Sequence, residues 1–90
     1  MSYETKFSDG SIIDNYMAVG IAEGFEESNA EEAIERQKDI IRAWSYICGT
    51  KLYRGLQGWF GRNVASFIEQ GYMQDDGTVN WESIDEMIEI

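Results

Sequence analysis

The chain has 90 residues, 43% of them hydrophobic, and its 17 carboxylates and 7 bases give a formal net charge of −10. This length and apolar content predict one domain over 1–90 and exclude a largely disordered chain. The single cysteine excludes a disulfide framework, and the lack of histidine argues against a zinc site. No apolar run reaches the roughly 18 residues of a membrane span, and no signal peptide is recognised, so we expect a cytosolic protein.

Residues 1–8 show little periodicity, so we expect an extended or frayed start. Ser11, followed three residues later by Asp14, has the pattern of a helix N-cap. Apolar residues then recur at helical spacing up to Gly24, a natural helix terminator. The pattern predicts a first helix over 11–23.

The clearest periodicity belongs to a second helix, predicted over 29–48. Ser28 followed by Glu31 has the pattern of a capping box at its start. On its outer face, pairs such as Asp39 with Arg42 each add a few tenths of a kcal/mol. Its apolar face, at i, i+3, i+4 and i+7 spacing, consists of Ala33, Ile34, Gln37, Ile40, Ile41, Trp44, Ile47 and Cys48.

The same period continues and predicts a third helix near 51–70 that runs through Gly55, Gly58 and Gly61. Three interior glycines cost about 2–3 kcal/mol in helix propensity. Close approach of another backbone along this stripe would offset that cost, so we expect a tight, antiparallel helical hairpin over 28–71 as the core. The alternative is a break at Gly58 or Gly61, with a shorter helix after it.

The C-terminal part begins with a turn sequence, Asp-Asp-Gly at 75–77, which predicts a very short hairpin near 72–80. Asn80 then caps a last helix over 81–89. The predicted fold class is therefore all-α, or mostly α, with about four helices.

The charge is unevenly distributed. Residues 1–35 contain nine carboxylates and one base, residues 36–62 six bases and one carboxylate, and residues 63–90 seven carboxylates and no base. Pairing between the bases and acids of the chain itself explains such a pattern. The alternative is two functional faces of opposite charge. Direct binding of nucleic acid is not expected, because it requires basic groups that neutralise phosphates.

The sequence lacks the residues of familiar catalytic sites, so we expect no catalytic residue, cofactor or metal. There is no histidine to act as a base, and Cys48 lies on the apolar face of a helix. The adjacent acids Glu26-Glu27 and Glu31-Glu32 could hold a cation or act as a glycosidase pair only by converging in a cleft. Acids at a helix start usually face water.

Residues 54–62, RGLQGWFGR, form the most specific stretch of the chain. The glycine spacing matches neither the dinucleotide-binding fingerprint nor the Walker motif. Packing against a neighbouring helix is one interpretation, and a recognition surface is the other. Because Trp and Arg are common interface anchors, the candidate partner-binding residues are Arg54, Gln57, Trp59 and Arg62.

The run LQGWFGR at 56–62, with the small and apolar residues that follow it up to Gly71, resembles short uncharacterised bacteriophage proteins that share an L-Q-G-x-[YF]-G-R motif. The similarity covers about 22–71, and Cys-Gly-Thr at 48–50 departs from the threonine-glycine order of that family. The resemblance implies a phage origin and expression in a bacterial cytoplasm. It implies no activity and no binding residues.

The leading hypothesis is a phage accessory protein that binds and modulates a host protein in the host cytoplasm, without catalysis and without a membrane partner. One alternative is a DNA mimic that inhibits a nucleic-acid-binding enzyme of host defence or transcription. Another is a protein that sequesters a small ligand or nucleotide, and a structural virion component and a homo-oligomer also fit the sequence. The candidate acidic face of a DNA mimic consists of Glu26, Glu27, Glu31, Glu32 and Glu35.

Overall fold

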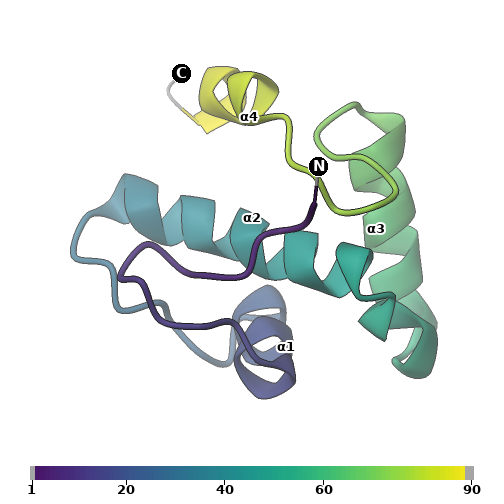
Figure 1. Ribbon diagram of the computed structural model, residues 1–90, viewed down its shortest axis with the longest axis horizontal. Coiled ribbons are helices and arrows are strands. Elements are labelled where there is room, and N and C mark those ends of the chain that lie inside the picture. Colours follow the sequence, from purple (N-terminus) through teal and green to yellow (C-terminus); the bar gives the residue numbers. More distant parts are fainter. Residues whose placement is uncertain (1, 89–90) are drawn as a thin grey trace.

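A computed structural model describes residues 2–88 and shows an all-α protein, as the sequence predicts (Figure 1). Residue 1 of the expected start 1–8 and residue 89 of the expected last helix lie outside the described residues. The radius of gyration is 12.0 Å, the value expected for a compact chain of this length. The helices are α1 (Asn15–Glu23), α2 (Ala33–Gly49), α3 (Gly58–Glu69) and α4 (Trp81–Ile88), with one 3-10 turn, η1 (Leu52–Gly55).

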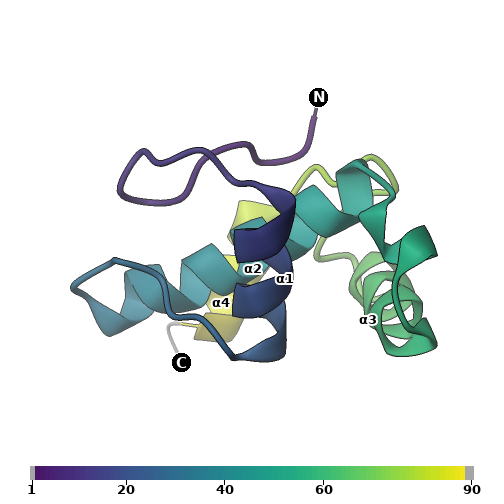
Figure 2. The same cartoon turned by 90° about the horizontal axis from the view of Figure 1, so that it is seen from below.

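Helix α2 is the central element. Helices α1 and α4 lie on opposite sides of it, and α3 crosses near its C-terminal end (Figures 1 and 2). The N-terminal segment runs along α2 on a further side (Figure 2). Because every other element packs on it, α2 is the helix with the most fully buried side chains.

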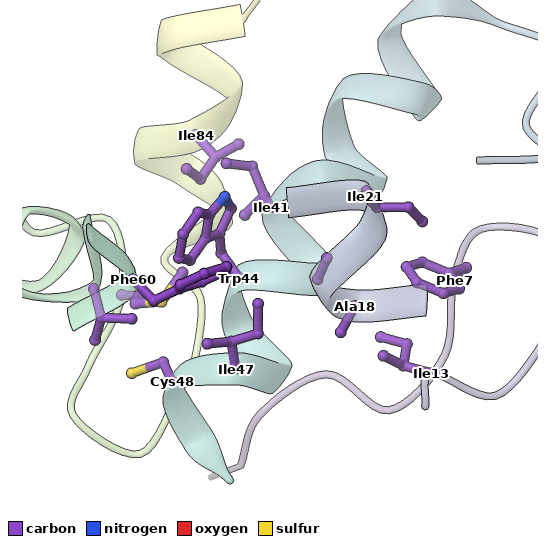
Figure 3. Packing of buried hydrophobic residues seen from close by; sticks show 13 residues of the cluster. Phe7, Ile13, Ala18, Ile21, Ile41, Trp44, Ile47, Cys48, Phe60 and Ile84 are labelled. Carbon is purple, nitrogen blue, oxygen red and sulfur yellow. The ribbon is translucent and has the colours of Figure 1, made fainter. Parts of the chain in front are cut away.

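The core forms on both sides of α2 (Figure 3). On one side the Trp44 ring, 4% exposed, lies 5.8 Å from the Phe60 ring and 5.6 Å from the Phe67 ring, centroid to centroid. Ile84 of α4 is fully buried in the same cluster. The side towards α1 contains Phe7, Ile13, Ala18 and Ile21.

The predicted starts of the first two helices are wrong, because the serines expected as caps bond elsewhere. Helix α1 begins four residues late, since Asp14 is its N-cap and accepts from the Met17 N–H at 2.8 Å, while Ser11 bonds to Asp9. Helix α2 begins at Ala33, and Ser28 accepts from a backbone N–H within the preceding loop. The predicted end of α1 at Gly24 is confirmed by its left-handed backbone, with φ 85°.

The single long helix predicted over 51–70 is also wrong. The chain forms η1, becomes extended at residues 56–57, and starts α3 at Gly58. The break therefore lies just before Gly58, close to the alternative given by the sequence. Helix α3 then crosses α2 near one end (Figure 1), so the helices expected over 28–71 do not pack along their lengths.

The close backbone approach expected at the glycine stripe does not occur. A Cβ added to Gly55 would meet nothing within 4 Å. At Gly58 it would lie 3.2 Å from the Arg62 guanidinium, and at Gly61 it would lie 3.7 Å from the Tyr53 ring. The space beside Gly55 is open, and side chains, with no second backbone, lie beside Gly58 and Gly61.

Backbones approach closely at a different pair of glycines, Gly49 and Gly77. A Cβ on Gly77 would lie 2.5 Å from the Ser45 carbonyl oxygen and 3.0 Å from the Gly49 Cα, and a Cβ on Gly49 would overlap the Tyr3 ring. The Ser45 hydroxyl, fully buried, donates to the Gly77 carbonyl and accepts from the Glu4 N–H at 2.9 Å. The N-terminal segment and the 72–80 turn are thus both fixed to the end of α2.

Asp39 is the second buried polar side chain of α2. The predicted pair with Arg42 forms at 2.8 Å, yet Asp39 is 1% exposed and does not lie on the outer face. Its two oxygens also accept from the Ser8 N–H at 2.9 Å and the Ser8 hydroxyl at 2.8 Å. A buried carboxylate with three donors therefore ties the N-terminal segment to α2.

The C-terminal predictions are confirmed within the described residues. An isolated antiparallel bridge joins Met73 to Val79 and closes the expected hairpin. The Asn80 side chain accepts from the Ser83 N–H at 3.3 Å and so caps α4, which follows the predicted helix 81–89 as far as residue 88.

The two sets of glycines give opposite predictions for alanine substitution. Gly77→Ala places a Cβ against backbone at a positive φ of 88°, so we expect it to lower the unfolding free energy by more than about 2 kcal/mol. Gly55→Ala, with open space around it, should leave stability unchanged or raise it by up to about 1 kcal/mol. Urea unfolding followed by circular dichroism measures both, and equal effects would contradict the structure.

Asp39→Ala leaves the Arg42 guanidinium and the Ser8 N–H without their buried acceptor. We expect a loss of about 3–5 kcal/mol of unfolding free energy, typical of a broken buried pair. The matched control is Asp75→Ala, which removes a carboxylate that is 86% exposed and pairs with Lys51. The control should cost under about 1 kcal/mol in the same urea titration. A similarly small loss for Asp39→Ala would refute its structural role.

Candidate functional site

Segment 54–62 lies on the surface where the chain passes from η1 into α3. Lys51 adopts a left-handed backbone, with φ 61°, that turns the chain out of α2. Leu56 and Gln57 are extended, and α3 starts at Gly58. All four candidate partner-binding side chains are exposed around this turn: Arg54, Gln57, Trp59 and Arg62.

Trp59 has one edge in the core and one edge in water. It is 40% exposed, and its ring meets the buried Trp44 ring edge-on at a centroid distance of 5.6 Å and the Phe60 ring at 4.8 Å. Such aromatic pairs add about 0.5–1.5 kcal/mol beyond area burial. A large ring held in place in this way loses little side-chain entropy on binding, which favours its use as an interface anchor.

Arg54 and Arg62 are exposed bases that form no ion pair within the described residues 2–88. Among residues 2–88, no carboxylate lies within ion-pair distance of either guanidinium. The missing side chain at Gly58 leaves room for the Arg62 guanidinium to lie over the start of α3. Both arginines are therefore available to an anion from outside.

The remaining bases of residues 36–62 are engaged within the protein, by ion pairs of 2.8–3.8 Å or by bonds to carbonyl oxygens. The internal pairing expected from the sequence thus occurs for Lys38, Arg42 and Lys51, while Arg36 bonds to backbone carbonyl oxygens. The partners are the Ala30 and Glu31 carbonyls for Arg36, Asp85 for Lys38, Glu4, Glu35 and Asp39 for Arg42, and Asp75 for Lys51.

Three of the five acids considered for a DNA-mimic face lie together. Glu31, Glu32 and Glu35 line an open hollow, together with Asp9 and Arg42. Arg42 pairs with Glu35 at 3.5 Å and reduces the negative potential of the hollow. The hollow is therefore acidic but contains one internal cation.

The other two acids lie apart from this hollow. Glu27 is exposed and lines a separate depression beside Arg36. Glu26 accepts a hydrogen bond from the Tyr16 hydroxyl at 3.1 Å and lines a groove along α1. The structure therefore gathers Glu31, Glu32 and Glu35, and places Glu26 and Glu27 elsewhere.

The groove along α1 has an apolar lining that the sequence did not predict. This lining consists of Tyr16, Val19, Phe25, Leu52 and Leu56. The periodicity suggested one buried face for the first helix, and Ala18 and Ile21 do form that face. Tyr16 points to water and is 72% exposed. The sequence contains one indication of this groove, because apolar residues lie on more than one face of this helix of nine residues.

The described residues include one cysteine and several acids that were considered for chemistry. Within residues 2–88, no group of three or more His, Cys, Asp or Glu side chains is placed to hold a metal ion. Cys48 is fully buried, and desolvation raises the pKa of its thiol, which makes it a poor nucleophile. No helix in this part of the chain is long and apolar enough to cross a bilayer.

Fold and surface together define a small all-α protein with an exposed turn that carries Arg and Trp. No protein-family model, curated protein or solved structure matches this chain. The function is therefore inferred from the chemistry of the chain's own surface.

The Tyr16–Glu26 contact predicts a shifted titration. The hydrogen bond to Glu26, and then the charge of that carboxylate, raise the pKa of Tyr16 above its ordinary value of 10.0. Because the folded pKa is the higher one, the contact stabilises the fold fully below pH 10.0, and its contribution is lost as the pH rises through the folded value. We expect Glu26→Gln to return the pKa towards 10.0.

Tyrosinate absorbance measures this titration, with Tyr16→Phe identifying the signal of residue 16. Glu27→Gln is the control of equal charge change, because Glu27 lies outside the groove. A Tyr16 pKa that is the same with and without the Glu26 carboxylate would show that the contact does not form in solution.

Proposed function

We propose that this chain is a small acidic accessory protein of bacteriophage type that binds and modulates a host protein in the host cytoplasm, without catalysis. The observation that carries the proposal is the pair of exposed arginines, Arg54 and Arg62, unpaired by any described acid of a chain with net charge −10. The Trp59 ring of the same exposed segment, packed against Trp44 and Phe60, supports it. The resemblance of residues 56–62 to the L-Q-G-x-[YF]-G-R motif of short phage proteins supports the phage origin.

The chemistry of this surface suits a protein partner. Each guanidinium presents a planar set of donors that fits a carboxylate, and a Trp edge fits an apolar pocket. The exposed Gln57 amide adds both a donor and an acceptor. We therefore infer a partner surface with carboxylates beside an apolar pocket. A nucleic-acid partner is disfavoured, because the net charge of −10 repels phosphates.

Arg54→Ala and Arg62→Ala test the proposal more cleanly than a change at Trp59, which contacts the core. Each should weaken partner binding by about tenfold or more, the loss expected for an interface hot spot. Affinity capture from bacterial lysate identifies the partner, and titration of that purified partner gives the affinities. Urea unfolding of both variants should match that of the original chain.

Lys6→Ala is the matched control, because it removes one exposed base far along the chain from the motif. It should leave binding unchanged. Arginine variants that bind as well as the control would refute the assignment of this surface.

DNA mimicry is the second candidate, and the hollow lined by Asp9, Glu31, Glu32 and Glu35 favours it. The longest dimension of the protein is 31 Å, a length over which duplex DNA carries about 18 charges. The same capture experiment separates the two candidates. If the captured partner is basic and its retention falls steeply as the salt concentration rises, DNA mimicry is favoured. If retention depends on Arg54 and Arg62, binding through the 54–62 surface is favoured.

A further inference from the structure

The groove between α1 and η1 leaves large apolar side chains in water. Phe25 is 82% exposed and Tyr16 is 72% exposed. They border an open volume of about 440 Å³ that the half-buried Val19, Leu52 and Leu56 also line. Contiguous exposed apolar surface with a polar rim is typical of interaction sites.

The backbone after α1 fixes the position of Phe25. Gly24 ends the helix in a left-handed conformation, and the N–H groups of Phe25 and Glu26 both donate to the Gly20 carbonyl, at 2.9 and 3.1 Å. The Glu26 side chain covers Gly20, where a Cβ would lie 2.6 Å from the Glu26 Cγ, and its carboxylate accepts from the Tyr16 hydroxyl. Phe25 therefore projects from an ordered turn at the edge of the groove.

The charges of the groove have one sign. Both charged residues that line it are glutamates, Glu23 and Glu26. In the described part of the chain, neither forms an ion pair with a base. The groove thus combines an apolar lining with carboxylates that a cation from outside can neutralise.

The fold restricts how a peptide can bind here. Residues 2–88 contain two isolated bridges and no β-strand, so an extended peptide finds no sheet edge to join. The apolar groove offers side-chain contacts, which suit the apolar face of a helix. We propose that the groove binds an amphipathic helix of a partner protein, with Lys or Arg beside its apolar anchors to meet Glu23 and Glu26.

A second copy of this chain fits the groove poorly. A symmetric contact through this face would bring Glu23 and Glu26 of both copies together, and each copy carries a net charge of −10. Charge complementarity therefore selects a basic partner helix. The proposal does not depend on the Arg54/Arg62 surface, which would bind acids.

The test uses the full chain and two synthetic helical peptides of about 16 residues, or about four turns each. Both peptides present the same leucine face, and one has lysines where the other has glutamates. We expect the lysine peptide to bind at least about tenfold more tightly, since its charges complement the rim. Fluorescence anisotropy of labelled peptide gives the affinity, and chemical-shift changes locate the site at Tyr16, Phe25 and Leu56.

Paired variants separate the groove from general attraction to an acidic protein. Phe25→Ser should weaken lysine-peptide binding by about tenfold or more, whereas Ile12→Ser, at an apolar residue 74% exposed outside the groove, should not. Glu23→Lys should weaken it more than Glu27→Lys, which makes the same charge change outside the groove. Both exposed serine variants should keep the original unfolding curve.

Arg62→Ala distinguishes this proposal from the proposed function, because it should leave lysine-peptide affinity unchanged. Equal affinity for the two peptides, or equal effects of Phe25→Ser and Ile12→Ser, would refute the groove as a site for a basic helix. Sedimentation that shows a dimer of the protein alone, dispersed by Phe25→Ser, would assign the groove to a second copy and also overturn the proposal.

Discussion

One buried carboxylate, Asp39 of α2, joins three parts of the molecule. It accepts from Ser8 of the N-terminal segment and from Arg42, which also reaches Glu4 and lies 5.1 Å from the centre of the Trp81 ring of α4. A carboxylate removed from water costs several kcal/mol unless its charge is paired and its oxygens are bonded. The irregular N-terminal segment therefore supplies two of the three donors that satisfy this buried carboxylate.

The sequence predicted the helices better than their ends. Helical spacing depends on residues of the same helix, so the all-α class, the position of α2 and the final helix could be read directly. Whether a serine caps a helix depends on whether its side chain bonds to the helix or to another polar group nearby. Ser11 bonds to Asp9, and Ser28 accepts from a loop N–H, so the starts of α1 and α2 were misplaced. Asp39 was misplaced for a similar reason, since its burial requires Ser8, distant in the sequence.

Glycine spacing was misleading because sequence alone does not say which glycine meets another backbone. The regular stripe at 55, 58 and 61 has open space or side chains beside it, while Gly49 and Gly77, which no motif connects, are packed against backbone or a ring. The exposed Arg and Trp side chains of the motif belong to one segment of nine residues, and their exposure agrees with their assignment as surface residues. The apolar groove was not predictable, because it depends on how α1 meets η1.

The contacts of α2 extend far along the chain in both directions. The Ser45 hydroxyl bonds to residues 41 positions before and 32 positions after it, and Ile84 completes the cluster around Trp44. During synthesis, helix α2 therefore leaves the ribosome before α3 and α4, whose side chains cover its Trp44 side. A nascent chain that ends before α3 presents the Trp44 side of α2 to the surrounding solution, the kind of surface that makes chaperones necessary.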